Sequence, residues 1–189
     1  MPIRVLVFPS LLFLESRRIS PAAKLESDPT AEILRMVGIL LALLIGVVAG
    51  LRAMTAPAAV SWAASLGWIS LGDTWLEFLG YRWTPWIFTI LAIGEFITDQ
   101  LPSTPSRTVP IQFGTRILIG SLCGAALGMA SAGWLPGAVA GAAGAVIGTL
   151  GGRAARAKLA SVFGRDSPAA ILEDGIAVGA AFLIVAAAQ

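Results

Sequence analysis

Apolar residues fall into six long stretches that are separated by short polar or proline-containing segments. The stretches cover residues 33–51, 55–70, 84–101, 115–134, 136–152 and 169–188. An α-helix rises about 1.5 Å per residue, so about 20 apolar residues cross a hydrocarbon core of about 30 Å. The pattern therefore predicts an all-α, polytopic transmembrane helix bundle of about six apolar helices.

The second stretch allows two topologies. Residues 55–70 are few for a full crossing, and Pro57 lies in the first turn, where proline is tolerated. If this stretch crosses, the bundle has six crossings. If 33–70 is one broken span, it has five, and the N-terminus moves to the opposite side. Both topologies place the loops 102–115 and 153–168 on the same side.

Composition supports a membrane protein and excludes several chemistries. Hydrophobic residues make up 57% and charged residues 13% of the chain, whereas soluble domains carry about 25% charged residues. The sequence has no histidine, and its single cysteine, Cys123, lies in an apolar stretch. Histidine-based metal sites, Ser-His-Asp triads and intrachain disulfides are thereby excluded. No basic run interleaved with aromatic residues indicates nucleic-acid binding, so the partner expected from composition is the lipid bilayer.

The first 35 residues differ from the rest of the chain. They hold a short apolar run, VLVFPSLLFL, followed by mixed charges and no small-x-small cleavage site. We expect a poorly ordered extension over 1–35 and a single transmembrane domain over 36–189. Met36 is a candidate for the natural start of translation.

Basic residues and tryptophans predict opposite sides of the membrane. Both topologies place one group of basic residues on a common side, namely Arg107, Arg116, Arg153, Arg156, Lys158 and Arg165. By the positive-inside rule, the loops 102–115 and 153–168 are cytoplasmic. Tryptophan favours the membrane interface, and five of the six fall at the other edge, namely Trp68, Trp75, Trp83, Trp86 and Trp134.

Glycines recur at a spacing of four in three of the stretches. This spacing places glycines on one helix face and lets a second helix approach closely, which predicts glycine-zipper packing, either static or sliding, and a possible route to a homo-oligomer. GVVAG (46–50) also resembles GAVAG (137–141) and suggests a weak inverted repeat. The predicted packing residues are Gly46, Gly50, Gly120, Gly124, Gly128, Gly137, Gly141, Gly144, Gly148 and Gly152.

Charged residues inside the apolar stretches are the strongest sign of a site, because each costs roughly 2.5–3.5 kcal/mol to insert. Glu95 and Asp99 share one helix face, and Glu173 and Asp174 occupy the first turns of the last predicted helix. The prolines of the following segment, QLPSTPSRTVP (100–110), are expected to exclude helix. Topology brings the charges to one depth on the cytoplasmic half, as a polar intramembrane cluster of Arg52, Glu95, Asp99, Arg107, Arg116, Glu173 and Asp174.

Four segments resemble a known bacterial family. GLRAMTAP (50–57), EFITDQLPSTPSRTVP (95–110), RILIG (116–120) and ILEDGIAV (171–178) occur in the order found in the bacterial membrane-protein family catalogued as domain of unknown function 4126. The resemblance covers about 37–185 and implies a multi-pass protein of the bacterial inner membrane, with no established activity. It carries over Arg52, Glu95, Asp99, Pro102, Arg116, Glu173 and Asp174.

Three functional hypotheses follow. The cluster is typical of a small ion-coupled, proton-coupled or small-solute transporter or channel. Alternatively, the chain is a non-catalytic scaffold or assembly subunit whose ion pairs fix helix register. A membrane enzyme would need carboxylate or Ser/Lys chemistry, because the polar loops offer no histidine or cysteine. We therefore predict no catalytic residue, no metal site and no cofactor.

Overall fold

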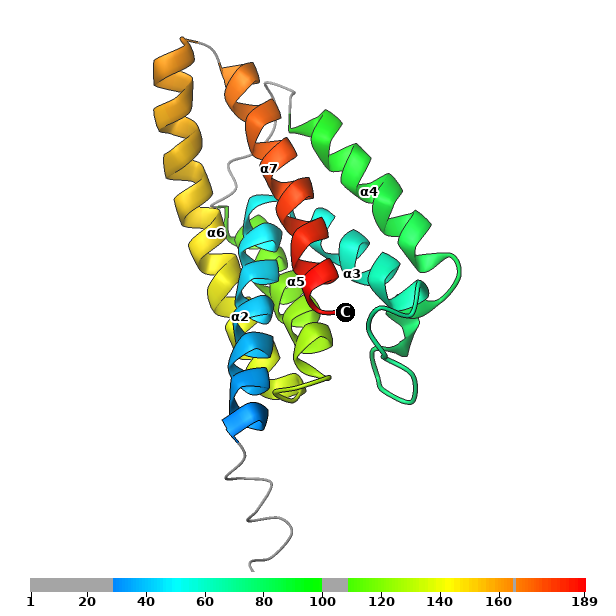
Figure 1. Cartoon of the computed structure of the whole chain (residues 1–189). Helices are drawn as coiled ribbons and strands as arrows, with labels where there is room; N and C mark the ends of the chain where they lie inside the picture. Colours follow the sequence, from blue (N-terminus) through cyan, green and yellow to red (C-terminus); the bar gives the residue numbers. More distant parts are fainter. Residues whose placement is uncertain (1–28, 100–108, 165) are drawn as a thin grey trace, which may run out of the picture.

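The computed structural model describes residues 29–99, 109–164 and 166–189, which form helices and connecting turns without a β-strand. Predictions on 1–28, and on Arg107 and Pro102, lie outside this range. The described part contains six α-helices that correspond to the six apolar stretches (Figure 1). They are α2 (Pro29–Leu51), α3 (Thr55–Ser65), α4 (Thr84–Thr98), α5 (Pro110–Gly128), α6 (Trp134–Phe163) and α7 (Asp166–Ala187), with a 3-10 helix η1 (Glu77–Gly80) before α4.

Four of these helices, α2, α5, α6 and α7, are long and apolar enough to cross a membrane. α3 has 11 residues and α4 has 15, so they extend only about 16 and 22 Å at 1.5 Å per residue. The chain is thus a helical bundle of the transmembrane type, in which two short helices accompany four full-length ones.

Several helix boundaries differ from the predicted stretches. α2 begins at Pro29, within the segment 1–35 that was expected to be poorly ordered, and α5 ends at Gly128 rather than near residue 134. Pro110 was expected to exclude helix, but it occupies the first turn of α5, where its missing N–H costs nothing and its fixed φ suits the helix. α6 continues beyond residue 152 to Phe163, through a segment predicted to be a loop. α3 ends at Ser65 rather than near residue 70. Apolar periodicity marks where a helix is buried, not where its hydrogen bonds stop.

The chain reverses direction between α2 and α3 (Figure 1). α3 runs antiparallel to α4, since Met54 contacts Glu95 and Trp62 contacts Thr89. α3 runs in the same direction as α7. Arg52, just before α3, contacts Asp174, and Trp68, just after α3, contacts Phe182. The two stretches of 33–70 therefore form a helical hairpin and not one continuous broken crossing.

The two similar segments GVVAG and GAVAG lie side by side. A Cβ atom at Gly46 would strike the backbone of Gly141, and one at Gly50 would strike Gly148. α2 and α6 therefore run in the same direction along this contact. An inverted repeat would place equivalent segments in opposite directions, so these two segments do not form one.

Glycines bring the backbones of α2, α5 and α6 into contact. Added Cβ atoms at Gly120 and Gly124 would collide with backbone atoms of Gly141, and one at Gly144 would collide with backbone atoms of Leu43 and Val47. Nine of the ten predicted packing glycines meet backbone atoms in this way, and a Cβ at Gly152 would meet the side chain of Leu51. We call α2, α5 and α6 the glycine core.

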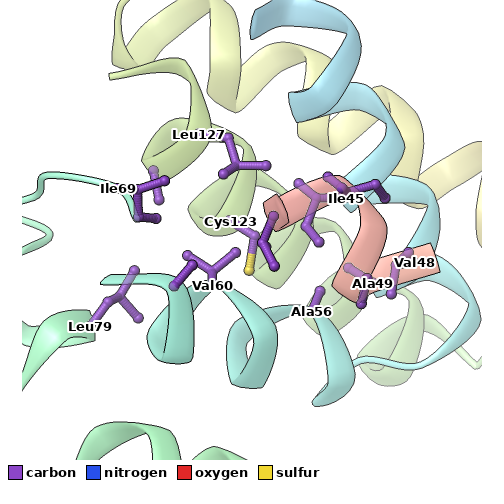
Figure 2. Packing of buried hydrophobic residues seen from close by; sticks show 14 of the residues in the cluster. Ile45, Val48, Ala49, Ala56, Val60, Ile69, Leu79, Cys123 and Leu127 are labelled. Atoms are coloured by element: carbon purple, nitrogen blue, oxygen red, sulfur yellow. The ribbon is translucent and has the colours of Figure 1, made fainter. Parts of the chain in front are cut away.

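Apolar side chains fill the space between the glycine core and α3. Figure 2 shows Cys123 of α5 among Ile45, Val60 and Leu127, all of which are buried. This packing holds α3 against α5 and α2, and it places the break between α2 and α3 next to the residues described below.

Candidate functional site

The helical hairpin leaves backbone groups without helical partners at residues 52–54. The last carbonyl groups of α2 and the first N–H groups of α3 have no partner within their own helices. Arg116, in the second turn of α5, donates from Nη1 to the carbonyl oxygens of Gly50 and Leu51, each at 2.9 Å. Its positive charge also favours the negative end of the α2 dipole.

Glu95 caps the free backbone N–H groups at the start of α3. Its Oε1 and Oε2 accept hydrogen bonds from the backbone N–H groups of Ala53 and Met54, each at 2.8 Å. Arg116 Nη2 lies 3.3 Å from Glu95 Oε1. The two side chains, which we call the capping pair, therefore satisfy both sides of the helix break and neutralise one another.

Arg52 lies in the break itself and is fully buried. Its Nη1 pairs with Asp99 Oδ2, and its Nη2 pairs with Asp174 Oδ1. The guanidinium carbon lies 5.5 Å from the centroid of the Phe96 ring, a cation–π distance. We call Arg52, Asp99 and Asp174 the Arg52 centre.

Three helical segments build the Arg52 centre. Asp99 directly follows the last residue of α4, as its C-cap, and Asp174 lies in the third turn of α7, since that helix begins at Asp166. Placing Asp174 in the first turns of its helix was therefore inaccurate, and the helix dipole contributes little there because it acts within the first turn. The carboxylate is balanced by Arg52 instead.

Glu173 pairs with a residue outside the Arg52 centre, although it neighbours Asp174 in sequence. Its Oε2 lies 3.7 Å from Arg156 Nη1 on α6. The two adjacent carboxylates of α7 thus join different partners. The ion pairs between described members of the predicted cluster lie in the Arg52 centre and the capping pair, and Glu173 adds a pair with Arg156, while Arg107 lies outside the described residues.

The carboxylates of the Arg52 centre are more exposed than its guanidinium. The Asp99 and Asp174 side chains are 12% and 17% exposed, whereas Arg52 is 0% exposed. One buried positive charge therefore faces two partly exposed negative charges. A proton or a small cation that neutralises one carboxylate leaves Arg52 paired with the other, so the centre is able to change partners without exposing an unpaired guanidinium.

Two contributing residues carried little sequence signal. Thr149 lies within the glycine-rich run of α6, and its hydroxyl lies 2.8 Å from the carbonyl oxygen of Ala145 and 3.2 Å from that of Gly50. The sequence offered one clue to Thr149, because it is the single polar residue in an otherwise apolar run. Phe96 offered none, because an aromatic residue in such a helix ordinarily faces lipid or core.

Within the described ranges, no group of three or more cysteine, aspartate or glutamate side chains is arranged to hold a metal ion. Each carboxylate of the Arg52 centre and of the capping pair faces a guanidinium instead. The arrangement offers paired charges, hydrogen-bond capping and exchangeable carboxylate partners.

The fold and the charged groups define a multi-pass helical protein of the transmembrane type, with buried ion pairs at a helix break. Residues 39–188 match the family described as Domain of unknown function (DUF4126), and the chain belongs to this family. The resemblance inferred from the four sequence segments is thereby confirmed. No curated protein and no solved structure matches the chain.

Proposed function

We propose that the chain is a small membrane transporter or channel for a proton, another cation or a small solute, with the Arg52 centre as its site. The observation that carries this proposal is the fully buried Arg52 between two partly exposed carboxylates from different helices. Ionisable groups inside membrane helices are costly, and they are typical of ion and proton pathways.

The position of the centre at a helix break supports the proposal. Transporters commonly bind substrates and ions where membrane helices are discontinuous. Here the backbone groups at the break are held by the capping pair. Arg52, which lies between them, is consequently presented to α4 and α7 in a fixed place.

The attachment of α4 offers a physical route to motion. Among the described elements, α4 packs extensively only against α3 and η1. The Arg52 centre ties its end to α7 through Asp99 and Asp174. Neutralising either carboxylate removes one half of this tie, so binding of a cation is coupled to the position of α4.

Purified protein in liposomes tests the proposal. Proton, Na⁺ and K⁺ fluxes are measured with entrapped indicator dyes, for the wild type and for Asp174→Asn, which keeps the side-chain shape and removes the charge. Glu77→Gln, an exposed change in η1, is the matched control. We expect flux above that of empty liposomes, a reduction of about tenfold or more in Asp174→Asn, and wild-type flux in the control.

Liposomes that carry folded protein and show no flux of any of these ions above background contradict ion movement by this chain. Flux that is equal in the wild type and in Asp174→Asn removes the Arg52 centre from the pathway. Folding of each variant is checked by its elution as a single species and by its melting temperature.

The orientation belongs to the same proposal. We place the chain in a bacterial inner membrane with the Arg52 centre toward the cytoplasm. The end of α6 that lies beside this centre carries exposed Arg153 and Lys158, and basic residues favour the cytoplasmic side. The opposite end carries the contacting rings of Trp75 and Trp134, whose centroids are 6.2 Å apart. Labelling of single cysteines at 77 and 158 in intact cells distinguishes the two orientations.

A scaffold or assembly role is the second candidate. Two exposed glycines of α7 favour it. Gly175 and Gly179 have the four-residue spacing of helix-packing glycines, are exposed, and have no atom within 4 Å of an added Cβ. If a second copy of the chain docks there, the purified protein should be a dimer in detergent, and Gly179→Leu should convert it to a monomer. A monomer in both proteins argues against this role.

A further inference from the structure

An apolar cavity of about 440 Å³ lies between α3, α4 and α7. Its volume is within the range of about 300–1,000 Å³ that small-molecule sites occupy. Leu66, Ile93 and Phe182 line it and are also exposed on the outside of the bundle. The cavity therefore opens sideways, toward the lipid that surrounds a membrane protein.

The Arg52 centre lies one helical turn beyond the inner end of this cavity. Each of its members has a cavity-lining residue three or four positions away on its own segment. Thr55 follows Arg52 by three positions and Phe96 precedes Asp99 by three. Val178 follows Asp174 by four positions within α7, a spacing that places the two on one helix face. Among the described residues no charged side chain lines the cavity, but Phe96 does, and its ring centroid lies 5.5 Å from the guanidinium carbon of Arg52.

Four aromatic rings line the cavity, and the rest of its wall is almost wholly apolar. The rings belong to Trp62, Trp68, Phe96 and Phe182. Thr55 is 6% exposed, and its Oγ1 has no hydrogen-bond partner in the described part of the chain. This oxygen is itself covered by protein and is not exposed in the cavity wall, so recognition of a ligand falls to the aromatic rings.

We infer that the cavity binds a lipophilic cation, which enters from the bilayer and competes with Arg52 for Asp174. Aromatic faces attract cations, and aromatic cages are used to bind quaternary ammonium groups. Asp174 shares its guanidinium partner with Asp99. A ligand cation near Asp174 therefore leaves Arg52 paired with Asp99, and no buried charge is left alone.

This inference deepens the proposed function by naming a class of solute, and it rests on that function for its biological meaning. Binding is nevertheless measurable without flux, so the two fail separately. Binding without ion or solute movement would remove the transport proposal and keep the site. Ion flux without binding of a lipophilic cation would remove the site and keep transport.

Two ions of nearly the same shape and opposite charge provide the test. Tetraphenylphosphonium and tetraphenylborate are measured by equilibrium dialysis against the purified full chain in detergent, with detergent alone subtracted. We expect tetraphenylphosphonium to bind one site per chain and tetraphenylborate to bind about tenfold more weakly or not at all, because Asp174 repels an anion.

Two variants locate the site. Asp174→Asn is expected to weaken tetraphenylphosphonium binding by about tenfold and to abolish the preference between the two ions. Ala59→Phe fills the cavity from α3 and is expected to weaken binding of both. Ala143→Phe makes the same substitution on the exposed side of α6 and is the matched control, expected to bind like the wild type.

Several results overturn the inference. Equal affinity for the two ions in the wild type shows an apolar cavity without a preference for cations. Unchanged binding in a folded Ala59→Phe protein shows that the cation binds elsewhere. Absence of saturable tetraphenylphosphonium binding to the folded wild type shows that the cavity takes no lipophilic cation of this size.

Discussion

The glycine core and α4 are attached to the bundle by different means. In the core, α2, α5 and α6 meet through backbone atoms, and a single added methyl group would collide at most of the contacts. α4 rests on α3, through contacts such as the hydrogen bond from Trp62 Nε1 to Thr89 Oγ1 at 3.1 Å, and its inner end is held by charges. Close-packed backbones fit together in one arrangement. A charged group such as Arg52, by contrast, has more than one partner of opposite charge within reach.

This difference indicates where the protein is able to change shape. Van der Waals contact between backbones is lost within a fraction of an ångström, so the glycine core is expected to move as one body. The Arg52 centre joins the end of α4 to α7 by ion pairs alone, and in the proposed function protons or cations change these pairs. Substitutions in the two regions should therefore have different consequences, and the largest belongs to the core.

Gly141→Leu is expected to prevent folding. Gly141 faces Gly46 of α2 on one side and Gly120 and Gly124 of α5 on the other, so a leucine would have to separate three helices. The cost should exceed the roughly 1–3 kcal/mol usual for overpacking. The measurement is the yield of monodisperse protein after detergent extraction.

Gly175→Leu is the matched control for this substitution, because an added Cβ there meets no atom within 4 Å. Its yield should equal that of the wild type. Should Gly141→Leu give normal yield and melting temperature, the backbone contact at the centre of the core would not be what holds α2, α5 and α6 together.

Arg52→Met has the next largest expected effect. It leaves Asp99 and Asp174 facing each other's charge in a largely buried place, and removal of one partner from a buried ion pair costs about 3–5 kcal/mol. We expect a clear fall in melting temperature, with the chain still inserting in the membrane.

The charge argument is tested by restoring neutrality. The triple variant Arg52→Met, Asp99→Asn, Asp174→Asn has no uncompensated carboxylate at this centre, so it should recover most of the lost stability while losing cation flux. A triple variant that is no more stable than Arg52→Met would show that Arg52 contributes by shape and not by charge.

The sequence predicted the helices better than it predicted their contacts. Six apolar stretches became six α-helices because burial in lipid or in the bundle demands an apolar surface and internal hydrogen bonds. The positions of Arg52, Glu95, Asp99 and Arg116 in the predicted group were also evident from the cost of inserting charges. These arguments need only composition and order along the chain.

Partner choice could not be predicted, because it depends on helix rotation and on where each helix begins. Glu173 and Asp174 are adjacent, yet successive helical residues point about 100° apart, and the two side chains meet Arg156 and Arg52 respectively. Glu95 caps backbone N–H groups at the helix break. Every residue has a backbone, so the sequence does not show which backbone groups need a side-chain partner.

Two buried threonines provide the finest comparison of the regions. Thr149, in the glycine core, has its hydroxyl within hydrogen-bond distance of the carbonyl oxygens of Ala145 and Gly50. The hydroxyl of Thr55, at the cavity, has no partner in the described part of the chain. Replacing either residue by valine removes the hydroxyl and keeps a branched side chain of similar size.

We expect Thr149→Val to lower the free energy of unfolding by about 0.5–1.5 kcal/mol, the usual net value of a hydrogen bond. Thr55→Val should leave it unchanged or raise it slightly, because an unsatisfied buried hydroxyl is exchanged for a methyl group. Thermal unfolding of both variants in the same detergent measures the difference. A loss in Thr55→Val that equals the loss in Thr149→Val would mean that the Thr55 hydroxyl already has a partner, and the contrast between the two regions would not extend to their buried hydroxyls.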